Sequence, residues 1–167
     1  MIDRRASLRL LVLGGAAAGL AACGGGGGGA PTSGTGAEAG SVLGILRANG
    51  LTRFLRAIED AGLAETLAGD GPFTVFAPTN AAMAAANLPE DTEALRRIVA
   101  FHIVPGMFTT DFLSGVDVNY TTLDDARRVN VDGTGAALTV NGATIVTPDL
   151  GADNGVVNIV DRVLIPR

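Results

Sequence analysis

The chain has little of several residue types on which functional sites are often built. Its 167 residues include one Cys, one His, no Trp and no Lys, so all 12 basic residues are Arg. A single Cys excludes a disulfide within the chain, and one Cys with one His cannot complete a zinc site of the Cys/His type. The 17 acidic residues outnumber the arginines and give a formal charge of -5, which argues against nucleic acid as a partner. A histidine-dependent enzyme would have to use His102.

The N-terminus has the layout of a secretory signal peptide over residues 1–22. Three arginines precede an uncharged run of 13 residues, 10–22, whereas a membrane-spanning helix needs about 20. The run therefore predicts export rather than a permanent transmembrane helix. The adjacent Arg4 and Arg5 also resemble a twin-arginine export signal, and the general and twin-arginine routes stay equally open.

Residues 20–23 (LAAC) resemble the lipobox of bacterial lipoproteins, which implies a lipid attached to Cys23. The alternative is an accidental Cys in an Ala-rich stretch. Residues 23–40, which contain six consecutive glycines, predict a flexible linker because they offer almost no apolar area to bury. We therefore expect a protein of the bacterial cell envelope, anchored on the extracytoplasmic side and either periplasmic or at the cell surface, with the choice between inner and outer membrane open.

Residues 41–167 are long enough for one domain, and their pattern changes half-way. Helical periodicity dominates the first half, with possible caps at Ser41, at Thr79 or Asn80, and at Asp91 or Thr92, and a strand at residues 73–76. After residue 106, short strands are predicted at residues 120–123, 129–131, 138–140, 144–146 and 156–160. This order predicts an α+β domain with a helical first half and a mainly antiparallel sheet.

Three blocks of the domain together resemble the fasciclin domain family. They are residues 73–83 (FTVFAPTNAAM), 101–106 (FHIVPG) and 154–166 (NGVVNIVDRVLIP), and residues 138–143 (LTVNGA) resemble the hairpin that precedes the last block. The resemblance covers residues 41–166 and implies a β-sandwich flanked by several helices. It also implies a role in cell adhesion or matrix contact.

The departures from the family pattern concern candidate binding residues. Met83 stands where the first block usually ends in Phe, Phe101 where a Tyr commonly precedes the His, and Asn158 where a His is frequent. The resemblance links the region of Phe101 and His102 to adhesion, so Phe101, His102 and Asn158 are the candidate binding residues. The missing hydroxyl at Phe101 weakens that transfer. A buried His102, hydrogen-bonded to a neighbouring strand or loop, is the favoured interpretation.

Other polar residues are predicted to specify the fold rather than to carry chemistry. Thr79, Asn80 and Asp161 are short polar side chains suited to satisfying backbone groups at turns and caps. Three acidic pairs are interpreted as solvated faces, because sequence neighbours do not face one another on a helix or strand: Glu59-Asp60, Glu90-Asp91 and Asp124-Asp125. Asp149, Asp153 and Asn154 lack the spacing of an EF-hand loop, so neither metal nor cofactor is predicted.

The sequence therefore favours a non-catalytic, lipid-anchored protein, expected to be a monomer, that presents a binding surface to a protein or glycan partner. An alternative is a binder of small molecules or lipids that uses an apolar cleft between the helices and the sheet. A hydrolase that depends on His102 is the third hypothesis.

Overall fold

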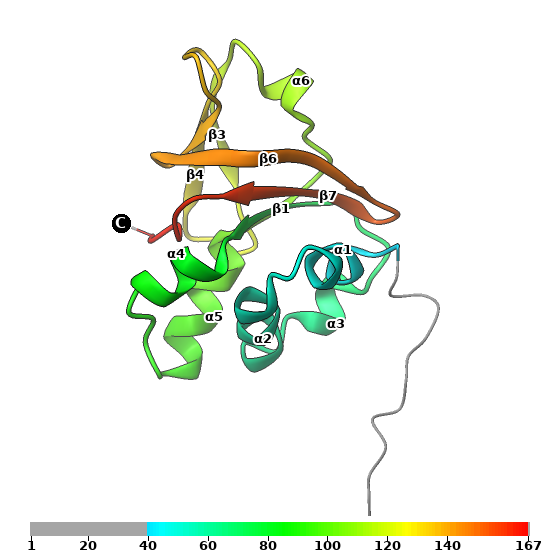
Figure 1. Ribbon diagram of the computed structural model, residues 1–167, viewed down its shortest axis with the longest axis vertical. Helices are drawn as coiled ribbons and strands as arrows, with labels where there is room; N and C mark the ends of the chain where they lie inside the picture. Colours follow the sequence, from blue (N-terminus) through cyan, green and yellow to red (C-terminus); the bar gives the residue numbers. More distant parts are fainter. Residues whose placement is uncertain (1–39, 167) are drawn as a thin grey trace, which may run out of the picture. The chain divides into compact units, whose positions relative to one another are not determined.

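The computed structural model describes residues 40–166. The predicted signal peptide, Cys23 and the linker up to residue 39 lie outside the described residues. Three helices open the domain, α1 (Val42–Ala48), α2 (Thr52–Asp60) and α3 (Ala64–Leu67). After the first strand come α4 (Asn80–Ala85) and α5 (Thr92–Phe101), and a short α6 (Thr110–Leu113) lies among the strands (Figure 1).

Side-chain caps fix three of the predicted helix starts. Ser41 Oγ accepts a hydrogen bond from the Gly44 N–H at 3.3 Å. The structure selects Thr79 as the cap of α4 and Asp91 as the cap of α5, where their oxygens accept backbone N–H groups at 3.2 and 2.9 Å. Each cap satisfies a backbone donor that has no partner within its helix.

Seven strands form one hydrogen-bonded sheet in the order β2-β1-β7-β6-β5-β4-β3. Their bounds are β1 (Phe73–Pro78), β2 (Ile103–Pro105), β3 (Asp117–Thr121), β4 (Arg128–Asp132), β5 (Thr139–Val140), β6 (Ala143–Ala152) and β7 (Gly155–Val160). All neighbours pair antiparallel except β1 and β7, which are parallel. The Leu123 N–H also donates to the Ile103 carbonyl at 2.9 Å, so the chain after edge strand β3 returns to edge strand β2. The predicted α+β class with a mainly antiparallel sheet is confirmed.

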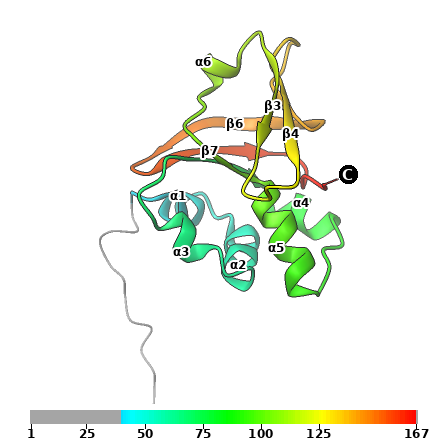
Figure 2. The ribbon, with the colours of Figure 1, turned by 180° about the vertical axis from the view of Figure 1, so that it is seen from behind.

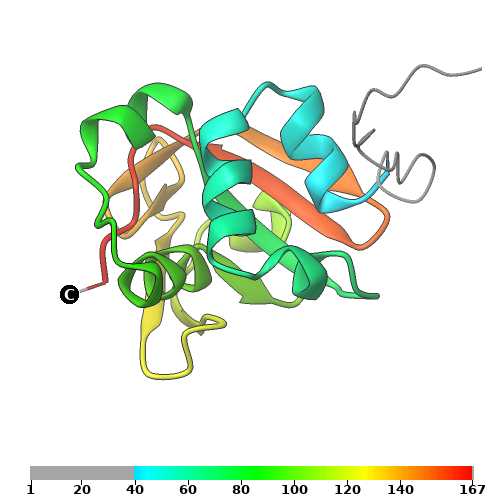
Figure 3. The same ribbon diagram turned by 90° about the horizontal axis from the view of Figure 1, so that it is seen from below.

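Two hydrophobic cores lie on the two faces of β1 and β7. Alternate residues, such as Val75 and Val157, face the helices and join the first core cluster, while Phe76 and Val160 belong to the second cluster, with residues of β4 and β5. All six residues of β7 are buried. Seen from behind, β3 and β4 cross β6 and β7 on the side away from α1, α2 and α3 (Figure 2), and from below the helices cover the other side (Figure 3). The central strands therefore hold two layers together.

The second half of the chain differs in detail from the sequence prediction. Strand β6 extends over ten residues instead of the predicted three, with register shifts between Ile145 and Thr147 and between Thr147 and Leu150. The length of β6 was not predicted, because the strand is partly exposed and polar and contains a proline, which is unusual inside a strand. Strand β2 and helix α6 were not predicted, because segments of three and four residues are too short to show a periodicity.

Candidate functional site

The three candidate binding residues lie in the interior of the domain. Phe101 is 2% exposed, and His102 and Asn158 are fully buried. Phe101 ends helix α5, His102 follows it, and Asn158 lies in the central strand β7. The expectation that His102 and Asn158 present a binding surface must therefore be corrected, because neither side chain is exposed, whereas Phe101, although only 2% exposed, is one of the residues that line a surface cavity.

Both ring nitrogens of His102 are used inside the fold. The backbone N–H of Leu164 donates to His102 Nε2 at 2.9 Å, so Nε2 carries no proton. Nδ1 is therefore protonated, and it donates to the Ile98 carbonyl at 2.7 Å. Desolvation lowers the pKa of His102 to about 4, although the bond to Ile98 acts in the opposite direction. The imidazole is neutral at pH 7 and has no free nitrogen for a substrate or a metal.

Asn158 supports the irregular part of β6. Its Oδ1 accepts the backbone N–H of Asp149 at 2.9 Å, where Asp149 adopts a positive φ of 53°. The Asp149 carboxylate in turn accepts hydrogen bonds from the backbone N–H and the hydroxyl of Thr110 at the start of α6. The amide nitrogen of Asn158 is buried and has no hydrogen-bond partner among residues 40–166. Asn158 therefore connects the central strand, through β6, to α6.

Thr79 and Asn80 connect β1 to the helices. The Thr79 backbone N–H donates to the Val160 carbonyl at 3.1 Å, in addition to the role of its side chain as a cap. Asn80 Oδ1 accepts the Arg53 N–H at 3.1 Å, and its Nδ2 donates to the Gly50 carbonyl at 2.8 Å. One amide side chain thus bridges the turn between α1 and α2.

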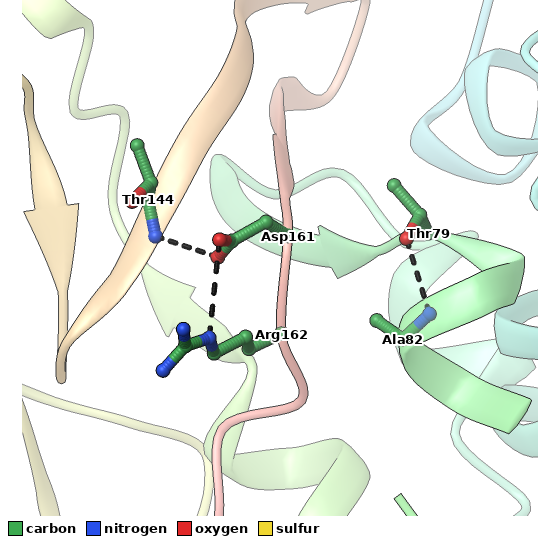
Figure 4. Close-up of polar contacts among 5 residues, drawn as sticks. All are labelled: Thr79, Ala82, Thr144, Asp161 and Arg162. Carbon is green, nitrogen blue, oxygen red and sulfur yellow. Dashed lines mark hydrogen bonds and ion pairs between the residues drawn. The ribbon is translucent and has the colours of Figure 1, made fainter. Parts of the chain in front are cut away.

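Asp161 holds the end of β7 against the start of β6. Its Oδ1 accepts the Thr144 N–H at 2.8 Å, and its own N–H donates to the Thr144 carbonyl at 3.0 Å. The other carboxylate oxygen lies 3.9 Å from Arg162 Nε (Figure 4). Because both side chains of this ion pair are well exposed, we expect it to add little stability.

The acidic residues of the β6–β7 region do not form a metal site. Asn154 Oδ1 accepts the Val42 N–H at 2.9 Å, and its Nδ2 donates to the carbonyls of Leu67 and Gly69. The Asp149 carboxylate accepts its hydrogen bonds from Thr110 of α6. Within residues 40–166, no group of three or more His, Cys, Asp or Glu side chains is placed to hold a metal ion.

Sequence reasoning missed several surface cavities, and two of them bear on function. One of about 590 Å³ is lined by Arg127, Arg128 and Arg162 together with the β5–β6 turn and the C-terminal segment. A second of about 460 Å³ lies among α2, α4 and the start of α5 and combines Met83, Leu88 and charged side chains of α2. The adjacent arginines 127 and 128 were visible in the sequence, but nothing local indicates that Arg162 joins them. The space between the helices and the sheet, where an apolar cleft was the alternative expectation, is filled by the first core cluster.

Comparison with known proteins identifies the fold. The family model of the fasciclin domain matches residues 49–166. The chain belongs to the fasciclin domain family. The fasciclin domain pair of the insect cell adhesion molecule Fasciclin I superimposes with a TM-score of 0.60 at 27% identity, covering 70% of this chain and 46% of that one.

Several relatives resemble this fasciclin domain at the sequence level. Protein sll1483 of Synechocystis is 36% identical over 118 residues, which cover 66% of this chain and 64% of the relative. The cell surface glycolipoprotein MPB83 of Mycobacterium bovis is 35% identical over 113 residues, covering 64% of this chain and 49% of MPB83. Human periostin is 32% identical over 125 residues, 70% of this chain but 14% of periostin. The chain thus spans under two thirds of the length of each of these three relatives, two of which come from bacteria and one from human.

Proposed function

We propose that this chain is an exported, lipid-anchored protein whose single fasciclin domain presents a non-catalytic binding surface for adhesion or for contact with the envelope matrix. The observation that carries the proposal is the family match over residues 49–166. The state of His102 agrees with it, because the only histidine of the chain is neutral, buried and fully hydrogen-bonded. The proposed partner is a protein or a glycan outside the cell membrane, and the proposed state is a monomer.

The anchor rests on the sequence before the domain. Cys23 follows the apolar run and precedes the six glycines, as expected for an acylated residue followed by a tether. The name of MPB83, a cell surface glycolipoprotein, supports an anchor of this kind. No helix within residues 40–166 is long and apolar enough to cross a membrane.

A deletion strain tests the adhesion role. Cells that lack the gene should lose attachment to one another or to a surface, and expression of the full chain should restore it. Complementation with a Cys23→Ser chain tests whether the protein must be anchored to the cell. We expect the unanchored protein to be released and to inhibit attachment by occupying the partner. Unchanged attachment of the deletion strain under several growth conditions would contradict the proposed function.

A second candidate function is the binding of a small apolar molecule in the cavity among α2, α4 and α5. Its volume of about 460 Å³ lies within the range of small-molecule sites, and Met83 and Leu88 supply apolar contacts. Replacing Leu88 with Asp should then abolish binding of a fluorescent fatty-acid probe to the full chain. A chain that does not bind the probe at all would exclude this candidate.

A further inference from the structure

The cavity with three arginines gathers positive charge on an acidic protein. Nine of the twelve arginines lie in residues 41–167, and three of these nine, Arg127, Arg128 and Arg162, line the cavity of about 590 Å³. No acidic residue is among the residues that line it. Within the described residues, Arg127 and Arg128 form no ion pair, and Arg162 has only the 3.9 Å contact with Asp161. The cavity is therefore a local exception to the negative charge of the chain.

Buried and backbone interactions hold the segments that carry these arginines. The hydroxyl of Thr122, a residue that is 1% exposed, shares its one proton between the Asp124 and Arg127 carbonyls, which lie 3.2 and 3.1 Å from Oγ1. The Arg127 N–H closes the same turn by donating to the Asp124 carbonyl at 2.9 Å. On the other side, the hydrogen bonds between Asp161 and Thr144 fix the backbone just before Arg162. Because the backbone at these arginines is already ordered, binding loses less conformational entropy there. The arginine side chains themselves are exposed.

The cavity wall combines these charges with apolar side chains. Ala143, Val163 and Ile165 line it, and Ile165 is 57% exposed. A guanidinium donates two parallel hydrogen bonds to a carboxylate, and arginine is enriched in protein interfaces. The volume of the cavity, about 590 Å³, is in the range of sites that enclose a small molecule or a few side chains. It is larger than a single inorganic anion needs. The combination suits carboxylates that alternate with aliphatic groups.

The cavity also lies away from the point where the predicted tether enters the domain. The Gly40 carbonyl accepts the Asp153 N–H at 2.7 Å, next to the start of β7, whereas Arg162 follows the end of β7. Six residues of strand separate these two points by about 20 Å. In Figure 1 the described chain accordingly begins at one end of β7 and the C-terminus lies at the other. An anchored domain can thus turn the cavity outward.

We propose that the cavity of Arg127, Arg128 and Arg162 binds an acidic segment of a partner protein, with the carboxylates on the arginines and an aliphatic side chain against Val163 and Ile165. The inference deepens the proposed function, on which it rests, by naming the surface and the chemistry of the partner. Exposed charges also make the association sensitive to salt.

Fluorescence anisotropy with a labelled decapeptide rich in Glu and Leu tests the site in the full-length chain. The peptide should bind, its affinity should fall as NaCl is added, and the same peptide with Gln in place of Glu should bind at least about tenfold more weakly. The triple variant R127Q/R128Q/R162Q should weaken binding of the Glu peptide by about tenfold or more. The matched variant R47Q/R96Q/R97Q removes the same charge away from both described cavities and should change the affinity by less than about twofold.

Thermal unfolding of both triple variants checks that the fold is retained. Equal weakening by the two triple variants would show a response to overall charge and overturn the site, as would equal binding of the Gln and Glu peptides. Arginine-dependent binding of dextran sulfate or inorganic phosphate without binding of the Glu peptide would overturn the assignment to an acidic protein. If deletion of the gene abolishes attachment but the Glu peptide does not bind, the proposed site is wrong and the adhesion role stands. If the peptide binds but the deletion strain attaches normally, the site stands and the adhesion role is wrong.

Discussion

Acidification should destabilise the domain through its one histidine. His102 has an ordinary pKa of 6.5 in the unfolded chain, whereas desolvation lowers its pKa to about 4 in the folded domain. At pH 7 the imidazole is largely neutral in both states. As the pH falls through 6.5, the unfolded chain binds a proton that the folded domain does not bind until about pH 4. The free energy of unfolding therefore decreases over this interval, and below about pH 4 the loss is complete.

The two pKa values set the size of the effect. The difference between 6.5 and about 4 corresponds to about 3 kcal/mol of stability when the pH has passed through the whole interval. Between pH 7 and pH 5 the loss should be about 2 kcal/mol, a large part of the stability of a domain of this size. Carboxylates titrate mostly below this window, so we expect the histidine to dominate it.

Urea unfolding followed by circular dichroism at pH 7 and pH 5 measures this loss. A His102→Leu chain is the matched control: it should be less stable at pH 7 by about 2 kcal/mol, because the N–H of Leu164 loses its acceptor, but it should lack the additional loss at pH 5. Because the chain has one His, NMR titration of the imidazole protons reports the folded pKa without any substitution. An imidazole that titrates near 6.5, or equal pH dependence of the two chains, would refute the reasoning.

Three further predictions concern the fold and the anchor. Asn80→Ala removes two hydrogen bonds to the turn between α1 and α2 and should lower the free energy of unfolding in urea by about 1 to 2 kcal/mol. Asn119 is an exposed asparagine of β3, and Asn119→Ala should lower it by under about 0.5 kcal/mol. Equal losses in the two variants would contradict the bridging role of Asn80. Gly155→Ala should cost about 1 to 3 kcal/mol, because a Cβ there would overlap the Phe73 carbonyl of the parallel partner strand, and an unchanged midpoint would count against the β1–β7 pairing. Cys23→Ser should release the protein from membranes on fractionation, and continued tight association would contradict the lipobox interpretation.

Local features of the domain were predictable because their causes lie within a few residues. The hydroxyl of Ser41 and the carboxylate of Asp91 are within reach of the N–H groups that they cap, three residues along the chain. The hairpin expected at residues 138–143 turns at Asn141 and Gly142, two residue types that readily adopt the positive φ angles observed there, 52° and 84°. Helix starts and the β5–β6 hairpin therefore follow from short-range geometry.

The candidate site was predicted less well, because burial depends on distant segments. The sequence blocks singled out Phe101, His102 and Asn158, yet only the packing of α5 and of strand β7 against the rest of the sheet shows that all three are interior. The hydrogen bond from Leu164 to His102 joins residues 62 positions apart, and no local pattern contains it.

The helical first half, the mainly antiparallel sheet and the family all follow from the sequence alone, as do the single Cys and the single His that restrict the available chemistry. The tertiary structure decided the parallel pairing of β1 with β7, since those strands are separated by about half of the chain and no turn connects them directly. It also decided that Arg162 lies beside Arg127 and Arg128, because the end of β7 and the start of β4 approach one another only when the sheet bends around the second core. Sequence patterns report neighbours along the chain, whereas a binding surface is made by neighbours in space.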